Sequence, residues 1–169
     1  MKFSKQITLK EYLNLVYVLT YKKGWMIFIT ILGLLMLLLT MIYLTGTAPV
    51  LFDNDYNPWT NIFMAFFFLV AIPGSIYYSA RSNYYSTKRL QESIDYELTD
   101  ETMRITGESF HTELNWNKAY KIEELKNWFL IYESKRTANF IDKKELSAEQ
   151  IQYLRSLFKT LGTVKLKLK

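Results

Sequence analysis

The chain has 169 residues, of which 21 are basic and 16 acidic, so its net charge is +5. It contains no cysteine, which excludes a disulfide framework and any metal site built on thiolates. With one histidine, no Gly-x-x-x-x-Gly-Lys loop and no Gly-x-Gly-x-x-Gly turn, it offers no motif for metal or nucleotide-phosphate binding. We therefore expect no metal and no cofactor.

The charged residues are unevenly distributed. Between Trp25 and Tyr78 only Asp53 and Asp55 are charged, whereas residues 81–169 hold 16 basic and 13 acidic residues. This contrast predicts a membrane region followed by a soluble one. Because the basic residues of the soluble region are matched by nearly as many acids, we expect no nucleic-acid partner.

Residues 1–23 contain the pattern of an amphipathic N-terminal helix. Thr8 and Glu11 fit a Thr-x-x-Glu capping box, and apolar residues recur behind it at helical spacing. Three placements stay open for this helix. It lies on the inner leaflet, it packs on the cytoplasmic domain, or it is an early start of the transmembrane helix that follows.

Two spans follow, at residues 25–44 and 59–78, joined by a connector at 45–58. Each span has 20 uncharged residues, which at about 1.5 Å per residue reach across the roughly 30 Å hydrocarbon core of a bilayer. Pro73 predicts a bend in the second span, since proline removes a backbone donor. The first span is longer than the apolar part of a cleaved signal peptide, and a second span follows it. We therefore predict a transmembrane hairpin over residues 24–80.

Residues typical of a membrane interface flank both spans. Aromatic side chains stand near the span ends, and basic residues precede the first span and follow the second, while the connector has no lysine or arginine. The positive-inside rule therefore predicts both termini in the cytoplasm and the connector outside. The predicted membrane-interface and lipid-contacting residues are Lys22, Lys23, Trp25, Tyr43, Trp59, Tyr77, Tyr78, Arg81, Lys88 and Arg89.

Residues 81–169 predict a small cytoplasmic domain. Alternation of apolar and polar residues indicates three consecutive antiparallel strands within 93–116 and a further hairpin at 128–143 around Lys135-Arg136. Residues 116–127 fit a short turn or strand that closes onto the sheet. Ser147 caps a helix that ends at Gly162. For the tail Thr163–Lys169 a last strand, a basic strip against anionic lipid and a frayed end stay open.

The C-terminal half also resembles a known family. Trp116, a Lys-Ile-Glu-Glu segment, "WFLIYES" and "NFIDKKELSAEQIQYLRSLFKTL" follow one another after two spans, an order similar to the YcxB-like family of bacterial membrane proteins. One departure is Ile141-Asp142-Lys143, where a proline is common in the family. The resemblance implies a compact, pleckstrin-homology-like domain, a location in the bacterial cytoplasmic (inner) membrane, and no established activity. The expected fold class is thus an α+β membrane protein, a transmembrane hairpin followed by a small antiparallel sheet with a C-terminal helix.

No catalytic constellation stands out in the sequence. Ser109, His111 and Glu113 share one strand face, but neighbours two apart on a strand are about 7 Å apart, too far for direct hydrogen bonds of a triad. Glu123 and Glu124 are adjacent and therefore diverge. We expect no enzymatic activity.

Three functions are consistent with these observations. The leading hypothesis is a non-enzymatic inner-membrane protein whose cytoplasmic domain binds a protein partner or a lipid surface. The first alternative is an immunity protein that neutralises a bacterial toxin, which rests on architectural analogy. The second is a subunit of a transporter or channel, although neither span carries an ionisable residue and no Gly-x-x-x-Gly motif directs oligomerisation. An oligomer stays open.

Overall fold

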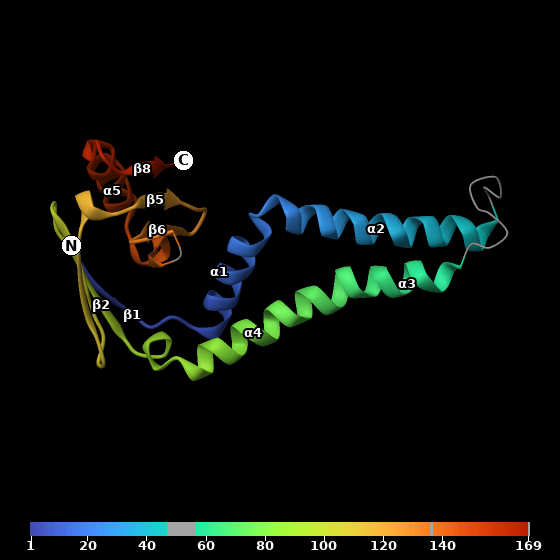
Figure 1. The fold of residues 1–169 in the computed structure, drawn as a ribbon. Helices are drawn as coiled ribbons and strands as arrows, with labels where there is room; N and C mark the ends of the chain where they lie inside the picture. Colours follow the sequence, from blue (N-terminus) through green and yellow to red (C-terminus); the bar gives the residue numbers. More distant parts are fainter. Residues whose placement is uncertain (47–56, 136, 169) are drawn as a thin grey trace. The chain divides into compact units, whose positions relative to one another are not determined.

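The computed structural model describes residues 1–46, 57–135 and 137–168, which belong to two compact units (Figure 1). One unit consists of Met1–Gln6 and Glu92–Lys169, and we call it the β unit. The other, Ile7–Gln91, is the helical unit. Helices and two small sheets make up the fold, so the predicted α+β class and the two long apolar helices are confirmed.

The helical unit begins with the capped helix that the sequence predicts. The Glu11 backbone N–H donates to Thr8 Oγ1 over 3.3 Å, and the Thr8 N–H donates to the Glu11 carboxylate over 3.0 Å. Lys23, in extended conformation, separates this helix from the next one. The elements of the unit are α1 (Leu9–Tyr21), α2 (Gly24–Thr45), α3 (Pro58–Phe66), the π-helix η2 (Phe67–Ala71), α4 (Ile72–Ser86) and the 3-10 turn η3 (Lys88–Leu90).

The π-helical turn η2 ends at Ala71, two residues before Pro73. Proline has no N–H to give to the carbonyl four residues earlier, so the regular hydrogen-bond ladder is interrupted there. The N–H of Ile72 donates instead to the carbonyl of Phe67, five residues back. A π-turn is one of the usual ways in which a helix accommodates such an interruption.

Helix α1 packs against α4 through polar side chains. The Tyr84 hydroxyl donates to the carbonyl of Ile7 over 2.9 Å, and the Tyr17 hydroxyl donates to the carbonyl of Pro73 over 2.9 Å. Since Tyr84 is buried, the first of these bonds satisfies a group that could not reach water. The two bonds fix α1 along α4 within the helical unit.

Sheet A of the β unit confirms the three predicted antiparallel strands and adds a fourth. Residues 2–5, for which the sequence predicts no strand, pair with the strand at residues 94–98, and every neighbouring pair is antiparallel. A four-residue strand is too short to show a clear alternation by itself. The order is β1 (Lys2–Lys5), β2 (Ile94–Leu98), β3 (Thr102–Thr106) and β4 (His111–Asn115).

Sheet B corrects the expectation of one antiparallel sheet. The segment at 121–124 starts a second sheet instead of closing the first, and the predicted hairpin at 128–143 belongs to this second sheet. The tail forms a strand that pairs in parallel with residues 121–123, so the sheet is mixed. Its order is β7 (Ala138–Asp142), β6 (Trp128–Tyr132), β5 (Lys121–Glu124) and β8 (Lys165–Lys167). Arg136 and Lys169, parts of the predicted turn and tail, lie outside the described residues.

Helix α5 (Ala148–Thr160) closes the core of the β unit. It begins with a capping box in which the Gln150 N–H donates to Ser147 Oγ over 3.2 Å. Phe158 is fully buried, and its ring centroid lies 5.4 Å from that of Trp116 and 5.6 Å from that of Phe129. These edge-to-face contacts join α5 to sheet B at the centre of the core.

Two adjacent carboxylates of β5 are buried and paired in different directions. Glu124 accepts hydrogen bonds from Arg155 Nη2 over 2.6 Å and from Lys143, and this bonding raises the pKa of Arg155. Glu123 lies 3.1 Å from Lys121 Nζ. The two side chains therefore diverge, as expected for neighbours on a strand, and Glu124 links β5 to α5.

Candidate membrane-embedded surface

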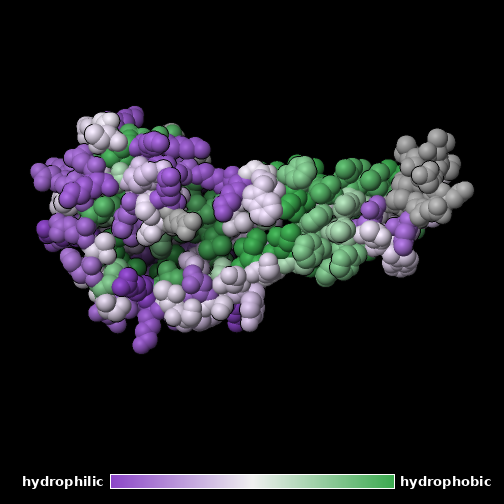
Figure 2. Space-filling view, in the orientation of Figure 1, coloured by the Kyte–Doolittle hydropathy of each residue, from purple (hydrophilic) through white to green (hydrophobic). Residues whose placement is uncertain are grey.

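Two helices present a large apolar surface. Gly24–Thr45 and Pro58–Ser86 are long and apolar enough to cross a membrane by length and composition, and only 11% and 6% of their most apolar windows are buried within the structure. A core helix of a soluble protein would be mostly buried. Figure 2 shows hydrophobic residues covering α2 and α3, whereas the β unit is largely hydrophilic.

The exposed side chains are bulky. Phe28 is 64% exposed, Leu44 70% and Trp59 73%. Each such residue would gain about 1.5–3 kcal/mol by leaving water. Soluble monomers rarely expose contiguous apolar patches larger than a few hundred Å², so an apolar surface along two whole helices is unusual for a soluble monomer.

The opposite stripe of α2 packs against α3 and η2. Met26, Gly33 and Thr40 are its buried residues and lie seven residues apart from one another, and Ala65 is buried on α3. The Thr40 hydroxyl is satisfied by donation to the carbonyl of Met36 over 2.9 Å. Residues seven positions apart lie on the same side of a helix after about two turns, so all three can face one neighbouring helix, as in coiled coils.

At Gly33 the two helices approach closely. A Cβ added there would lie 2.9 Å from Leu69 Cγ and 3.1 Å from Phe68 Cβ, both shorter than normal carbon contacts. This close approach fixes the level of α2 relative to η2. No Gly-x-x-x-Gly motif marks this contact in the sequence, because the buried residues of α2 recur every seven positions instead of every four.

The predicted aromatic residues fall at two levels of this helix pair. Counted from the contact between Gly33 and Leu69, Trp25 lies level with Tyr77, and Tyr43 lies about level with Trp59. Trp25 and Tyr43 are 18 residues apart, as are Trp59 and Tyr77. At 1.5 Å per residue the two levels are about 27 Å apart, close to the thickness of a hydrocarbon core.

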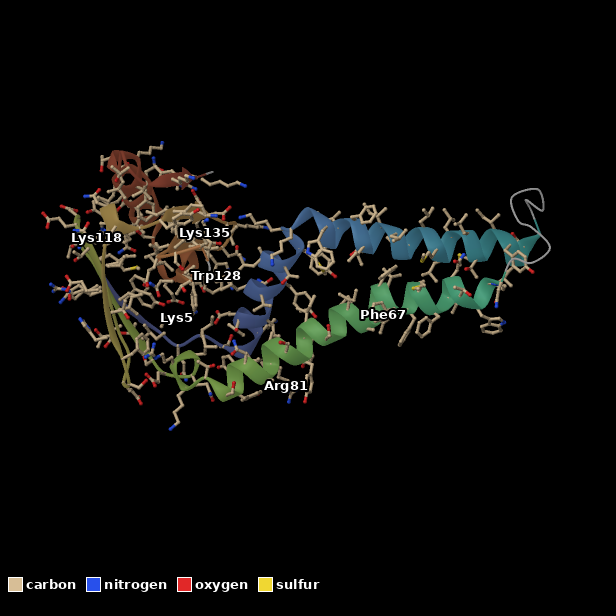
Figure 3. The ribbon with its side chains drawn as sticks, in the orientation of Figure 1. Lys5, Phe67, Arg81, Lys118, Trp128 and Lys135 are labelled. Atoms are coloured by element: carbon tan, nitrogen blue, oxygen red, sulfur yellow. The ribbon has the colours of Figure 1, made fainter. Side chains whose placement is uncertain are left out.

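The predicted basic residues lie at one end of the pair. Lys22 and Lys23 precede α2 at the level of Trp25, and Arg81 lies one turn beyond Tyr77 on α4. Figure 3 labels Arg81 on α4. Its Nη1 donates to the Tyr77 hydroxyl over 3.3 Å, and its guanidinium carbon is 5.7 Å from the Tyr85 ring centroid. The structure thus joins Arg81 to Tyr77. Three further residues were predicted to lie at the membrane interface. Tyr78 is exposed on α4, and Lys88 and Arg89 lie in η3.

The structure describes only part of the connector 45–58 between the two spans. Asp53 and Asp55 lie outside the described residues, as do residues 47–56 as a whole. In the described part of the chain, no lysine or arginine stands at the Tyr43 and Trp59 end. The end that carries Trp25 and Tyr77 is therefore the basic one.

The polar face of β4 does not form a triad. His111 Nδ1 shares a hydrogen bond of 2.9 Å with Thr106 Oγ1, and Glu113 pairs with Arg104 Nε over 3.1 Å. Both side chains thus bond to the neighbouring strand and not to each other. Among the residues that the structure describes, no group of three or more His, Cys, Asp or Glu residues is placed to hold a metal ion.

Comparison with known proteins yields one match, which lies in the β unit. Residues 98–158, from the end of β2 to near the end of α5, match the family described as YcxB-like protein. No curated protein and no solved structure matches the chain. The resemblance predicted from the order of motifs after Trp116 is confirmed, and over residues 98–158 the chain is similar to the YcxB-like family.

Proposed function

We propose that this chain is an integral protein of the bacterial cytoplasmic membrane that crosses the membrane twice and presents the β unit on the cytoplasmic side as a non-enzymatic binding domain for a protein partner. The observation that carries this proposal is the exposed apolar surface of α2 and of the helix Pro58–Ser86. In water these side chains would remain hydrated at a cost of about 1.5–3 kcal/mol each. In a bilayer they contact lipid chains.

The distribution of charge supports the orientation. Lys22, Lys23 and Arg81 lie at the end marked by Trp25 and Tyr77, and the connector 45–58 has no lysine or arginine. Short loops rich in lysine and arginine stay on the cytoplasmic side. Both termini, and the β unit with them, are therefore cytoplasmic in this proposal.

The charge of sheet A favours a protein partner over a lipid surface at that sheet. Residues 92–115, which contain β2, β3 and β4, hold seven acidic residues and one basic residue. The exposed acids Asp100, Glu101 and Glu108 lie at the hairpin turns of this segment. The anionic inner leaflet repels such acidic turns, whereas a basic protein segment complements them.

The outer face of sheet A has regular cross-strand pairs beside these turns. One row runs Lys2, Glu97, Arg104, Glu113, with Lys2 Nζ 2.9 Å from Glu97 and Arg104 Nε 3.1 Å from Glu113. The hydrogen bond from Lys2 lowers the pKa of the Glu97 carboxyl. These pairs neutralise one another, and three of the five other acids of the segment lie at the turns.

Single cysteines test the orientation cleanly, because the natural chain has none. Asp53→Cys lies in the connector, and Lys118→Cys lies in the β unit. We expect a membrane-impermeant maleimide to label Asp53→Cys on intact cells and Lys118→Cys only after the cells are permeabilised. The reverse pattern, or labelling of both on intact cells, would contradict the proposed topology.

Site-specific photo-crosslinking in the membrane tests the binding domain. A photoreactive residue at Thr106, on the outer face of sheet A, is expected to give a discrete adduct with another protein. The same residue at Ser156, on the exposed side of α5, is the control. Glu108→Lys should weaken the Thr106 adduct, since it reverses the charge at the turn next to Thr106. Equal adducts from both positions, or adducts with lipid alone, would argue against a protein partner at this face.

A further inference from the structure

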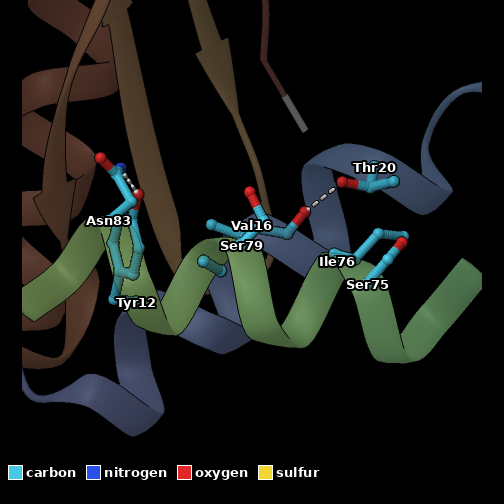
Figure 4. A pocket seen from close by; sticks show the side chains of 8 residues that line it. Tyr12, Val16, Thr20, Ser75, Ile76, Ser79 and Asn83 are labelled. Atoms are coloured by element: carbon cyan, nitrogen blue, oxygen red, sulfur yellow. Dashed lines mark hydrogen bonds between the residues drawn. The ribbon is translucent and has the colours of Figure 1, made fainter.

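A groove of about 520 Å³ lies between α1 and α4, entirely within the helical unit (Figure 4). Its walls are two stripes of residues at helical spacing. The walls include Tyr12, Val16 and Thr20 of α1 and Ser75, Ser79 and Asn83 of α4. Hydroxyl and amide groups thus line much of this groove.

Three hydrogen-bond donors in the groove are unused. Asn83 Nδ2 donates one hydrogen to the Tyr12 hydroxyl over 2.6 Å, which leaves the second amide hydrogen and the tyrosine hydrogen available. The Ser79 hydroxyl has no partner within residues 1–46, 57–135 and 137–168. The hydroxyls of Thr20 and Ser75 donate to their own helices, over 2.8 Å and 2.7 Å. The unused donors at the Tyr12 and Asn83 end can therefore donate hydrogen bonds to acceptor atoms of a ligand.

The groove lies at the depth of lipid headgroups if the helices cross the membrane as proposed. Ser75 is two residues before Tyr77, and Asn83 is six residues beyond it. At about 1.5 Å per residue, the groove runs from just inside the aromatic level to about 9 Å beyond it. The polar zone of one leaflet occupies a similar depth outside the hydrocarbon core.

We propose that this groove binds the glycerol-phosphate part of a membrane phospholipid. The phosphodiester and ester oxygens of such a lipid accept hydrogen bonds and match the free donors of Tyr12, Ser79 and Asn83. Val16 contacts the apolar part of the glycerol ester. Within the described part of the chain no charged side chain lines the groove, so anionic and zwitterionic phospholipids should bind alike. This inference rests on the proposed membrane location.

Native mass spectrometry of the full-length protein in detergent tests it. The probes are phosphatidylglycerol, phosphatidylethanolamine and dioleoylglycerol, of which the last lacks the phosphate. We expect one bound lipid with either phospholipid, and at least about fivefold less binding of dioleoylglycerol, the factor for one net hydrogen bond. Equal binding of all three would overturn the proposal.

Two serines of α4 provide a matched pair of variants. Ser79→Phe fills the groove, whereas Ser82→Phe makes the same change on the same helix at a residue that does not line it. We expect Ser79→Phe to lose the bound phospholipid and Ser82→Phe to keep it. Equal occupancy in both, or a dimer in place of the lipid adduct, would overturn the proposal. Should Ser79→Phe fail to fold, Ser79→Ala decides, with an expected drop of about fivefold.

Failure of this inference can be told apart from failure of the proposed function. Maleimide labelling of Asp53→Cys and Lys118→Cys reports on the membrane topology and does not depend on the groove. If the labelling shows the proposed topology while Ser79→Phe binds phospholipid like Ser82→Phe, only the groove assignment is wrong. If the labelling shows another topology, the membrane proposal fails first.

Discussion

Gly33→Leu should separate α2 from the helix it packs against. In the native chain, even a single Cβ at this position would be 2.9 Å from Leu69 Cγ and 3.0 Å from Leu69 Cδ2. Carbon atoms normally approach to about 3.5–4.0 Å. Phe68 Cβ, at 3.1 Å, is attached directly to the backbone and cannot rotate away. A leucine therefore has to displace the helix backbone itself.

The size of the effect follows from two opposing contributions. Inserting methylene groups into a packed contact costs about 1–3 kcal/mol, and a leucine at a site already too close for one carbon lies at the upper end. Replacing glycine within a helix returns about 1 kcal/mol. The net loss should be about 2 kcal/mol, or roughly 8–16 °C in Tm for a unit of this size.

Gly74→Leu is the matched control. A Cβ at Gly74 has nothing within 4 Å, so the same substitution should leave the stability unchanged or raise it slightly. Thermal unfolding of the full-length protein in detergent micelles, followed by circular dichroism, measures both variants. If Gly33→Leu unfolds at the wild-type temperature, the close approach of α2 to Leu69 and Phe68 is wrong.

Three further predictions concern the β unit. Phe158→Ala should destabilise it by about 3–5 kcal/mol in chemical denaturation, because the ring is fully buried between two aromatic neighbours, and a loss below 1 kcal/mol would contradict that packing. Ser147→Ala should cost about 1 kcal/mol through loss of the N-cap, while Ser156→Ala on the exposed side of the same helix should be near neutral in the same assay. Burial raises the pKa of Tyr96, so its stabilisation is complete below the unfolded pKa of about 10 and is lost as the pH rises above it. Denaturation at increasing pH should show a decline that Tyr96→Phe reduces, and an unchanged decline in the variant would assign it to other groups.

Elements whose signals are local were predictable from the sequence. The Thr8 and Ser147 caps, with Glu11 and Gln150 three residues later, fixed the starts of α1 and α5. Alternation over residues 94–115 indicated three consecutive strands, because hairpin partners are adjacent in sequence. Such patterns depend only on a few neighbouring residues.

Elements that depend on distant partners were not predictable in the same way. The strand at residues 2–5 exists because it pairs with residues 94–97, some 90 residues away, and its own four residues carry little signal. The parallel pairing of Lys165–Lys167 with residues 121–123 likewise joins segments that are far apart in the sequence. Local alternation identifies strands but does not assign them to sheets.

The candidate site shows the same limit. Apolar length, flanking aromatics and basic residues revealed the two long helices and their ends, since composition alone carries that information. The seam of Met26, Gly33 and Thr40 was not predictable, because its seven-residue spacing lies within a run of apolar residues that gives no contrast between the buried and exposed sides. The groove at Ser79 depends on α1 packing along α4, which no local pattern of either helix specifies.

The most direct test of the membrane proposal is a spin-label scan along residues 25–44 of α2 in bilayers of phosphatidylethanolamine and phosphatidylglycerol. Each position except Gly33, where a side chain would disturb the packing, is changed to cysteine in the cysteine-free chain, labelled, and measured for collisions with oxygen and with a water-soluble nickel complex. The proposal predicts high oxygen and low nickel accessibility at Leu35 and Leu38, low values of both at Thr40, and nickel accessibility that rises only near the ends of the scan. Nickel accessibility at Leu35 as high as at the ends would show that this surface faces water, and the protein would not cross the membrane there.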